Sequence, residues 1–215
     1  MTGGEVGTLL TSAVHAGTTG KWGYRLLGGH EQTQRWSHRD TPALNGQRIG
    51  GIAEYHLSGD GKIRTEAGLA RSSPYNDIVH QTAAANIHVS QTYALISYEQ
   101  SGLLIRGWWN GLFSDTDTRL FPPLSPLLTL TDRFGRTDQE SSLNTYDAEI
   151  RYRFSPLETL NLNMGANFRH IIYSTNILSN RTAENRLGLY AHGDWQVWPS
   201  LAISAGLRYD LDTFG

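Results

Sequence analysis

The 215-residue chain contains no cysteine, only two lysines and relatively few charged side chains. Without cysteine, a disulfide-stapled scaffold and a thiolate metal site are excluded. Charged residues make up 18% of the chain, below the roughly 25% that is typical of soluble domains. The net charge of −2 gives no basic surface, so no nucleic-acid partner is expected. No apolar run approaches the ~18 residues of a transmembrane helix, and the N-terminal residues lack the basic and apolar regions of a signal peptide.

The sequence does contain a recurrent alternation of apolar and polar residues, clearest in YDAEIRYRF at 146–154. Apolar and aromatic residues occupy the even positions of this stretch, and aspartate, glutamate and two arginines occupy the odd positions. Successive side chains of a β-strand point to opposite faces, so the stretch predicts a strand with one apolar and one charged face. The pattern recurs at 159–173, 184–197 and 201–211, which indicates an all-β chain.

The alternation predicts ten strands, at 7–16, 21–35, 47–58, 62–71, 83–98, 103–113, 142–154, 159–173, 184–197 and 201–211. Tight turns and long polar links alternate between these strands. The long links lie at 36–46, 72–82, 114–141 and 174–183. This order predicts an antiparallel up-and-down sheet with tight turns at one end and long loops at the other.

The length of the strands and their aromatic ends favour a transmembrane β-barrel segment of about ten strands. The predicted strands run to 10–16 residues, whereas strands of soluble sandwiches are nearer ~5–6 residues. The stretch 146–154 spans ~26 Å at ~3.3 Å per residue, which is close to the ~25 Å apolar band of an outer-membrane barrel. We therefore expect lipid on the apolar face and a polar lumen on the other, and outer-membrane lipid as a partner.

With lipid on one face of the sheet and the lumen on the other, individual side chains can be assigned to each face. The residues expected to face the lumen are Asp147, Glu149, Arg151, Arg153, Arg169, Arg186, His192, Asp194 and Arg208. The aromatic residues expected to face lipid are Trp22, Tyr152, Phe154, Phe168, Trp195 and Tyr209. A soluble β-sheet binding domain is the alternative, because a sandwich also alternates, with its apolar side packed inward against a second layer.

The C-terminal stretch GLYAHGDWQVWPSLAISAGLRYDLDTF, at 188–214, resembles TonB-dependent receptors of the Gram-negative outer membrane. The residues that match the family's strand–turn–strand pattern are Tyr190, Asp194, Trp195, Leu201, Gly206, Leu207, Arg208, Tyr209 and Asp210. The segments 20–36 and 104–115 are also similar in style to the family's barrel strands. The resemblance implies a cell outer-membrane location and energised uptake of a scarce ligand such as a ferric siderophore.

The sequence departs from this family in several ways. No plug domain and no TonB box can be recognised, so the TonB energy-coupling complex is expected as a partner only through a plug absent from this chain. The family's barrel has 22 strands, and we expect residues 1–215 to be a partial barrel domain that supplies about the second to the eleventh. A piece with two unpaired edges is not expected to insert as a working receptor by itself. A passive pore or structural barrel without energy coupling is the alternative function.

No arrangement of residues predicts catalysis, a metal or a cofactor. The eight histidines show no metal-ligand spacing, and the chain is not expected to be an enzyme. Ligand recognition is expected in the longest link, because loops on a rigid scaffold carry binding and arginine suits anionic groups. The candidate ligand-binding residues are Arg119, Phe121, Arg133, Phe134 and Arg136.

Overall fold

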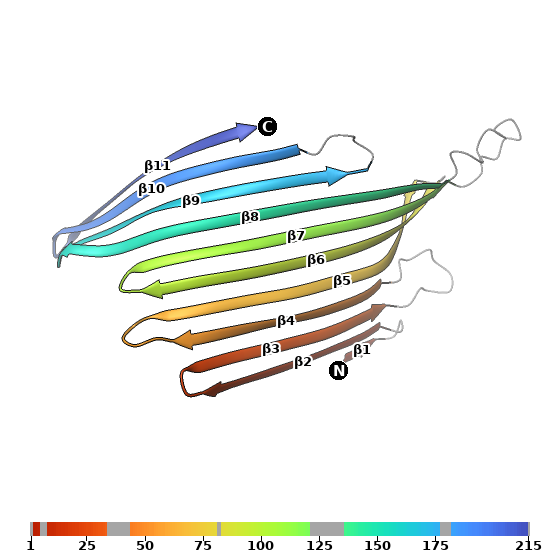
Figure 1. The fold of residues 1–215 in the computed structure, drawn as a ribbon, viewed down its shortest axis with the longest axis horizontal. Coiled ribbons are helices and arrows are strands. Elements are labelled where there is room, and N and C mark those ends of the chain that lie inside the picture. The colour runs from red at the N-terminus through yellow and green to blue at the C-terminus, as the bar shows by residue number, and fades with distance from the viewer. Residues whose placement is uncertain are drawn as a thin grey trace, which may run out of the picture.

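The computed structural model describes residues 2–4, 8–33, 44–80, 83–120, 136–176 and 182–214. These residues form a single antiparallel sheet in which each strand pairs with its neighbours in the sequence (Figure 1). The strands are β1 (Thr2–Gly4), β2 (Thr8–Thr19), β3 (Trp22–Thr33), β4 (Leu44–His56), β5 (Lys62–His80), β6 (Ala83–Gln100), β7 (Leu103–Leu120), β8 (Arg136–Leu157), β9 (Leu160–Thr175), β10 (Thr182–Trp198) and β11 (Leu201–Phe214). The predicted all-β, up-and-down fold with ten long strands is confirmed. The three-residue strand β1 was not predicted, and the sheet is open.

The tight turns lie together at one end of the sheet (Figure 1). Three turns contain a glycine with a positive φ angle, namely Gly20 at 57°, Gly59 at 77° and Gly102 at 82°. Residues with a Cβ atom rarely adopt this conformation. At Gly102 an added Cβ would also lie 2.0 Å from the carbonyl oxygen of Arg153, so this turn requires glycine for two reasons.

Two of the predicted long links are shorter than expected, because the strands beside them continue. Strand β5 extends to His80, and β7 and β8 extend into the segment 114–141 that was predicted to be a loop. Backbone pairing continues there through serine, threonine and aspartate, since a strand beyond the apolar band needs no apolar face. Pro74, which cannot donate to the ladder, lies where the register of β5 shifts between Ser72 and Tyr75.

The pairing of the long strands separates the two faces of the sheet. The pairs Asp147↔Arg169 and Arg169↔Arg186 lie side by side on one face, which we call the polar face. The nine residues predicted to face the lumen all lie on the polar face. The six aromatic residues predicted to face lipid lie on the opposite face, called the apolar face. The assignment of these faces to lumen and lipid stays a prediction.

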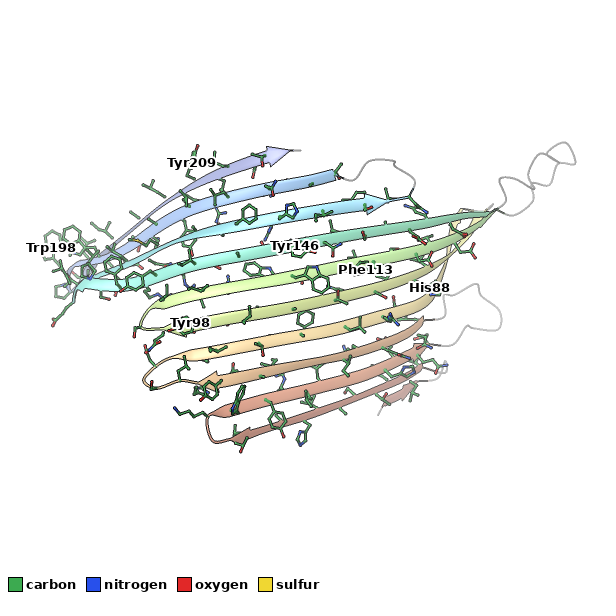
Figure 2. All side chains as sticks on the ribbon, viewed as in Figure 1. His88, Tyr98, Phe113, Tyr146, Trp198 and Tyr209 are labelled. Carbon is green, nitrogen blue, oxygen red and sulfur yellow. The ribbon has the colours of Figure 1, made fainter. Side chains whose placement is uncertain are left out.

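The described residues form one layer and have almost no core. Leu104 is their only buried hydrophobic side chain, whereas Leu207 is 82% exposed and Ile49 is 65% exposed. A soluble domain buries an apolar sheet face against a second layer, and the soluble-sandwich alternative required such a layer. Figure 2 shows side chains standing on the sheet without an element covering them. No helix in the described part of the chain is long and apolar enough to cross a membrane.

The strands are staggered, so that the row of tight turns is oblique to the strands. A line of directly paired residues that starts in the middle of β2 at Ser12 ends at Thr182, the first residue of β10. Along this line the paired position moves away from the tight-turn end by about one residue at each step to the next strand. This is ~3.3 Å along the strand for each ~4.8 Å step across the sheet, which corresponds to a strand tilt of about 35°. Strands of outer-membrane barrels tilt by ~35–45°, so the register matches that of a barrel wall.

Candidate functional site on the polar face

The polar face is hollowed over strands β7 to β11 by an open depression of about 550 Å³, which we call the charged depression. Its lining consists almost entirely of charged and amide side chains with two aromatic rings. The residues are Arg106, Trp108, Asp147, Glu149, Asn167, Arg169, Arg186, Tyr190, Arg208, Asp210 and Asp212. Five of the nine predicted lumen-facing residues therefore lie around one hollow.

Glu149 is the best-connected side chain of the charged depression. Its side chain is 10% exposed, and its Oε2 atom accepts a hydrogen bond of 2.6 Å from Arg106 Nε. Its Oε1 atom accepts a hydrogen bond of 2.8 Å from the Tyr190 hydroxyl. The Arg106 guanidinium also lies 4.9 Å from the centre of the Trp108 ring. Because both carboxylate oxygens have donors, Glu149 links three strands of the wall.

Tyr190 reaches Glu149 by passing over the intervening strand at a glycine. Tyr190 lies in β10, Glu149 lies in β8, and Gly165 of β9 is the direct partner of Tyr190. A Cβ atom at Gly165 would lie 2.5 Å from the Tyr190 hydroxyl oxygen and 2.6 Å from the carbonyl oxygen of Ile150. The bond between Tyr190 and Glu149 therefore requires a glycine at position 165.

A related arrangement occurs a second time, over β5 and β6, where the glycine, the glutamate and the arginine all lie in β5. Tyr93 is the direct partner of Gly68, and its ring lies over that glycine. Its hydroxyl donates to Glu66 Oε1 at 3.3 Å, while Arg64 Nη2 lies 2.9 Å from Glu66 Oε2. We call each set of tyrosine, glycine, glutamate and arginine a clasp. Sequence reasoning missed both clasps, because cross-strand partners depend on the register.

Asp147 is the most deeply buried charge on this face. Its side chain is 3% exposed, and its Oδ1 atom lies 2.6 Å from Arg169 Nε. Its Oδ2 atom has no hydrogen-bond partner among the described residues. A buried carboxylate is costly unless it is paired, so Arg169 stabilises the charge of Asp147.

The other predicted lumen-facing residues lie in more exposed positions. Arg186 pairs with Glu184 and lies 3.5 Å from Asp212, and Arg208 lies 2.8 Å from Asp210. His192 and Asp194 lie 3.1 Å apart. Such exposed pairs contribute little to stability. No ion pair of Arg151 or Arg153 occurs within the described ranges.

We expect Tyr190→Phe to destabilise the folded protein by about 1 kcal/mol, because it removes one of the two donors to the nearly buried Glu149. The measurement is the temperature at which the folded form, purified from membranes, unfolds in detergent. Tyr209→Phe, on the apolar face, is the matched control and should leave that temperature unchanged. An equal effect of the two variants would contradict the role of the clasp.

Two of the five candidate ligand-binding residues, Arg119 and Arg136, lie at the end of the sheet opposite the tight turns. Arg119 and Arg136 are directly opposite each other in β7 and β8, so they belong to strands and not to the predicted loop. Phe121, Arg133 and Phe134 lie outside the described residues. Within the ranges that the structure describes, no group of three or more histidine, aspartate or glutamate side chains could hold a metal ion.

The tilted, single-layer sheet with one apolar and one charged face has the architecture of a segment of a β-barrel wall. Solved structures that share this fold include TonB-dependent receptors. The ferric enterobactin receptor of Pseudomonas aeruginosa matches with a TM-score of 0.63 at 12% identity, over 98% of this chain and 38% of that chain. The FrpB iron transporter of Neisseria meningitidis matches with a TM-score of 0.71 at 12% identity, over 95% and 39%.

A third match is the hemophore receptor HasR of Serratia marcescens, with a TM-score of 0.65 at 12% identity, over 94% of this chain and 31% of that chain. The chain thus spans less than half the length of the receptors that it matches. No protein-family model matches the sequence, and no curated protein matches it significantly. The likeness is therefore one of fold, and the predicted resemblance to TonB-dependent receptors is confirmed at that level.

Proposed function

We propose that the chain forms part of the barrel wall of an outer-membrane receptor that imports a scarce ligand with energy supplied through the TonB complex. The observation that carries this proposal is the match of nearly the whole chain to the barrels of such receptors. The single layer and the exposed apolar face support it, because only lipid would stabilise that face without a second layer. The polar face then lines the lumen, and outer-membrane lipid is the partner of the apolar face.

The ligand class that we propose is an anionic iron chelate of the siderophore type. The matching structures include receptors described as binding ferric enterobactin and pyoverdine. Arg119 and Arg136 lie directly opposite each other where the longest link begins and ends. The two arginines suit an anionic ligand, because a guanidinium offers a planar fork of donors. Together with Phe121, Arg133 and Phe134, they are the proposed contacts of the ligand.

The test is carried out in cells that produce the protein from its own gene. The proposal expects the protein in the outer-membrane fraction after an alkaline carbonate wash, and it expects uptake of ⁵⁵Fe-enterobactin that a protonophore abolishes. Uptake that survives the protonophore would favour a passive pore. Recovery of the protein in the wash would contradict membrane insertion altogether.

We expect Arg119→Ala and Arg136→Ala each to weaken binding of ferric enterobactin by roughly tenfold, because each removes a charge-assisted hydrogen bond worth about 1.5 kcal/mol or more. The dissociation constant, measured by equilibrium binding to outer-membrane vesicles, checks this. Arg71→Ala, which removes an exposed arginine from the apolar side of the sheet, is the control and should bind normally. Unchanged binding in both the Arg119→Ala and the Arg136→Ala variant would exclude these arginines as ligand contacts.

A further inference from the structure

A second hollow, of about 450 Å³, lies on the opposite side of the sheet from the charged depression. It crosses strands β6 to β9 near the end away from the tight turns, and we call it the rim depression. Its lining includes His88, Ser90, Phe113, Asp115, Glu140 and Asn176. Figure 2 labels His88 and Phe113 on the neighbouring strands β6 and β7, far from Trp198 at the tight-turn end.

The rim depression begins where the apolar band of the apolar face stops. In β7 the next residue on this face after Phe113 is Asp115, and in β8 the residue beyond Tyr146 is Asn144. In β9 the last apolar residue on this face is Ile172, and Ser174 follows it. If the apolar band lies in hydrocarbon, the rim depression lies at the depth of the lipid head groups. Its natural occupant is then part of a lipid.

The rim depression contains two carboxylates, which would repel a phosphate group. Asp115 and Glu140 are directly opposite each other, both are exposed, and neither carboxylate has a hydrogen bond or ion pair in the described part of the chain. Two opposed carboxylates repel each other and an anion, and they need donors. A head group with several hydroxyl groups would supply them.

The Phe113 ring and the Asn176 side chain are two further features of the rim depression that favour binding of a sugar. The Phe113 ring is 40% exposed and gives a flat apolar surface on which the C–H groups of a pyranose can pack. Asn176 is held rigidly against β8, since its Oδ1 atom accepts a bond of 3.0 Å from Glu140 N and its Nδ2 atom donates one of 2.9 Å to the Asp138 carbonyl. It forms a fixed polar wall beside the two carboxylates.

We infer that the rim depression binds the saccharide head group of a glycolipid in the leaflet on the long-link side. This inference rests on the proposed function, because it requires the apolar face to meet lipid. The carboxylates of Asp115 and Glu140 accept hydrogen bonds from the sugar hydroxyls, and Phe113 packs against the sugar ring. The acyl chains of the glycolipid then continue down the apolar face.

The test uses native mass spectrometry of the protein purified from outer membranes in detergent. The probes are monogalactosyl diacylglycerol and phosphatidylglycerol with the same acyl chains. We expect the wild type to retain the galactolipid roughly tenfold better than the phospholipid, and Phe113→Ala and Asp115→Asn each to remove most of that preference. Phe168→Ala, which truncates a ring inside the apolar band, is the matched control and should keep the preference.

Equal retention of the two lipids by the wild type would overturn the inference, as would a preference that all variants keep. Loss of the preference after treatment with EDTA would also overturn it, because a divalent cation would then be bridging the carboxylates. The carbonate wash described above reports membrane insertion independently. A protein that resists the wash but shows no sugar preference therefore refutes this inference and leaves the proposed function standing.

Discussion

Ile150→Arg is expected to abolish accumulation of the folded protein in the outer membrane. Ile150 lies in the middle of the apolar stretch of β8, is 48% exposed, and has Ile105 and Ala166 as its direct partners. If hydrocarbon covers this position, an arginine near the bilayer midplane costs about 2–4 kcal/mol. If water covers it, the substitution replaces one exposed side chain by another and costs almost nothing. The amount of folded protein in carbonate-washed outer membranes is the measurement.

Thr145→Arg is the matched control for this prediction. Thr145 lies in the same strand on the polar face, where its partners are Asn110 and Ile171. We expect this variant to accumulate at close to the wild-type level, since the polar face already carries several arginines. Equal accumulation of both variants would mean that the two faces meet the same solvent.

Gly68→Ala is expected to lower the free energy of unfolding by about 2 kcal/mol or more. An added Cβ atom would overlap the Tyr93 ring, so the ring must move and its hydroxyl loses Glu66. Overpacking of this kind costs about 1–3 kcal/mol, and the lost hydrogen bond adds about 1 kcal/mol. For a chain of this size we expect the unfolding temperature to fall by roughly 4–8 °C.

A double-mutant cycle isolates the cause. In a Tyr93→Ala background the ring is gone, and Gly68→Ala should then cost almost nothing, because the Tyr93 ring supplies the nearest atoms to the added Cβ. Gly23→Ala, where the nearest atom is the Thr18 Cγ2 methyl at 3.9 Å, is the surface control. A Gly68→Ala cost that persists without Tyr93 would show that strand propensity, not the clasp, requires the glycine.

The arrangement of strands could be predicted from the sequence because one physical signal repeats in every strand. Alternation at 146–154 separates apolar from charged side chains whatever their partners are, and it placed all nine polar residues on one face. Strand ends near turns were also predictable, since Gly59 and Gly102 mark positions that require a positive φ angle. The signal fails beyond the apolar band, where β7 and β8 continue through serine, threonine and aspartate without alternating.

The partners of the charged residues could not be predicted, because they depend on the register between strands. Glu149 pairs with Arg106, 43 residues away, and with Tyr190, 41 residues away. Nothing in the local sequence distinguishes Gly165, which must be glycine, from glycines whose neighbours leave room for a side chain. The position of Arg119 opposite Arg136 is likewise a property of the paired strands, and the sequence suggested only a loop.

Trp108 and Trp109 provide the most direct test of the claim that lipid covers the apolar face. They are adjacent in β7 but lie on opposite faces, with Trp108 opposite Asp147 and Trp109 opposite Tyr146. Two variants are needed, each of which keeps only one of these residues and replaces the other tryptophans by phenylalanine. With the protein in bilayers, we expect brominated lipid to quench the fluorescence of Trp109 strongly, and aqueous iodide to quench only Trp108. Strong quenching of Trp108 by the brominated lipid, with Trp109 open to iodide, would contradict the account.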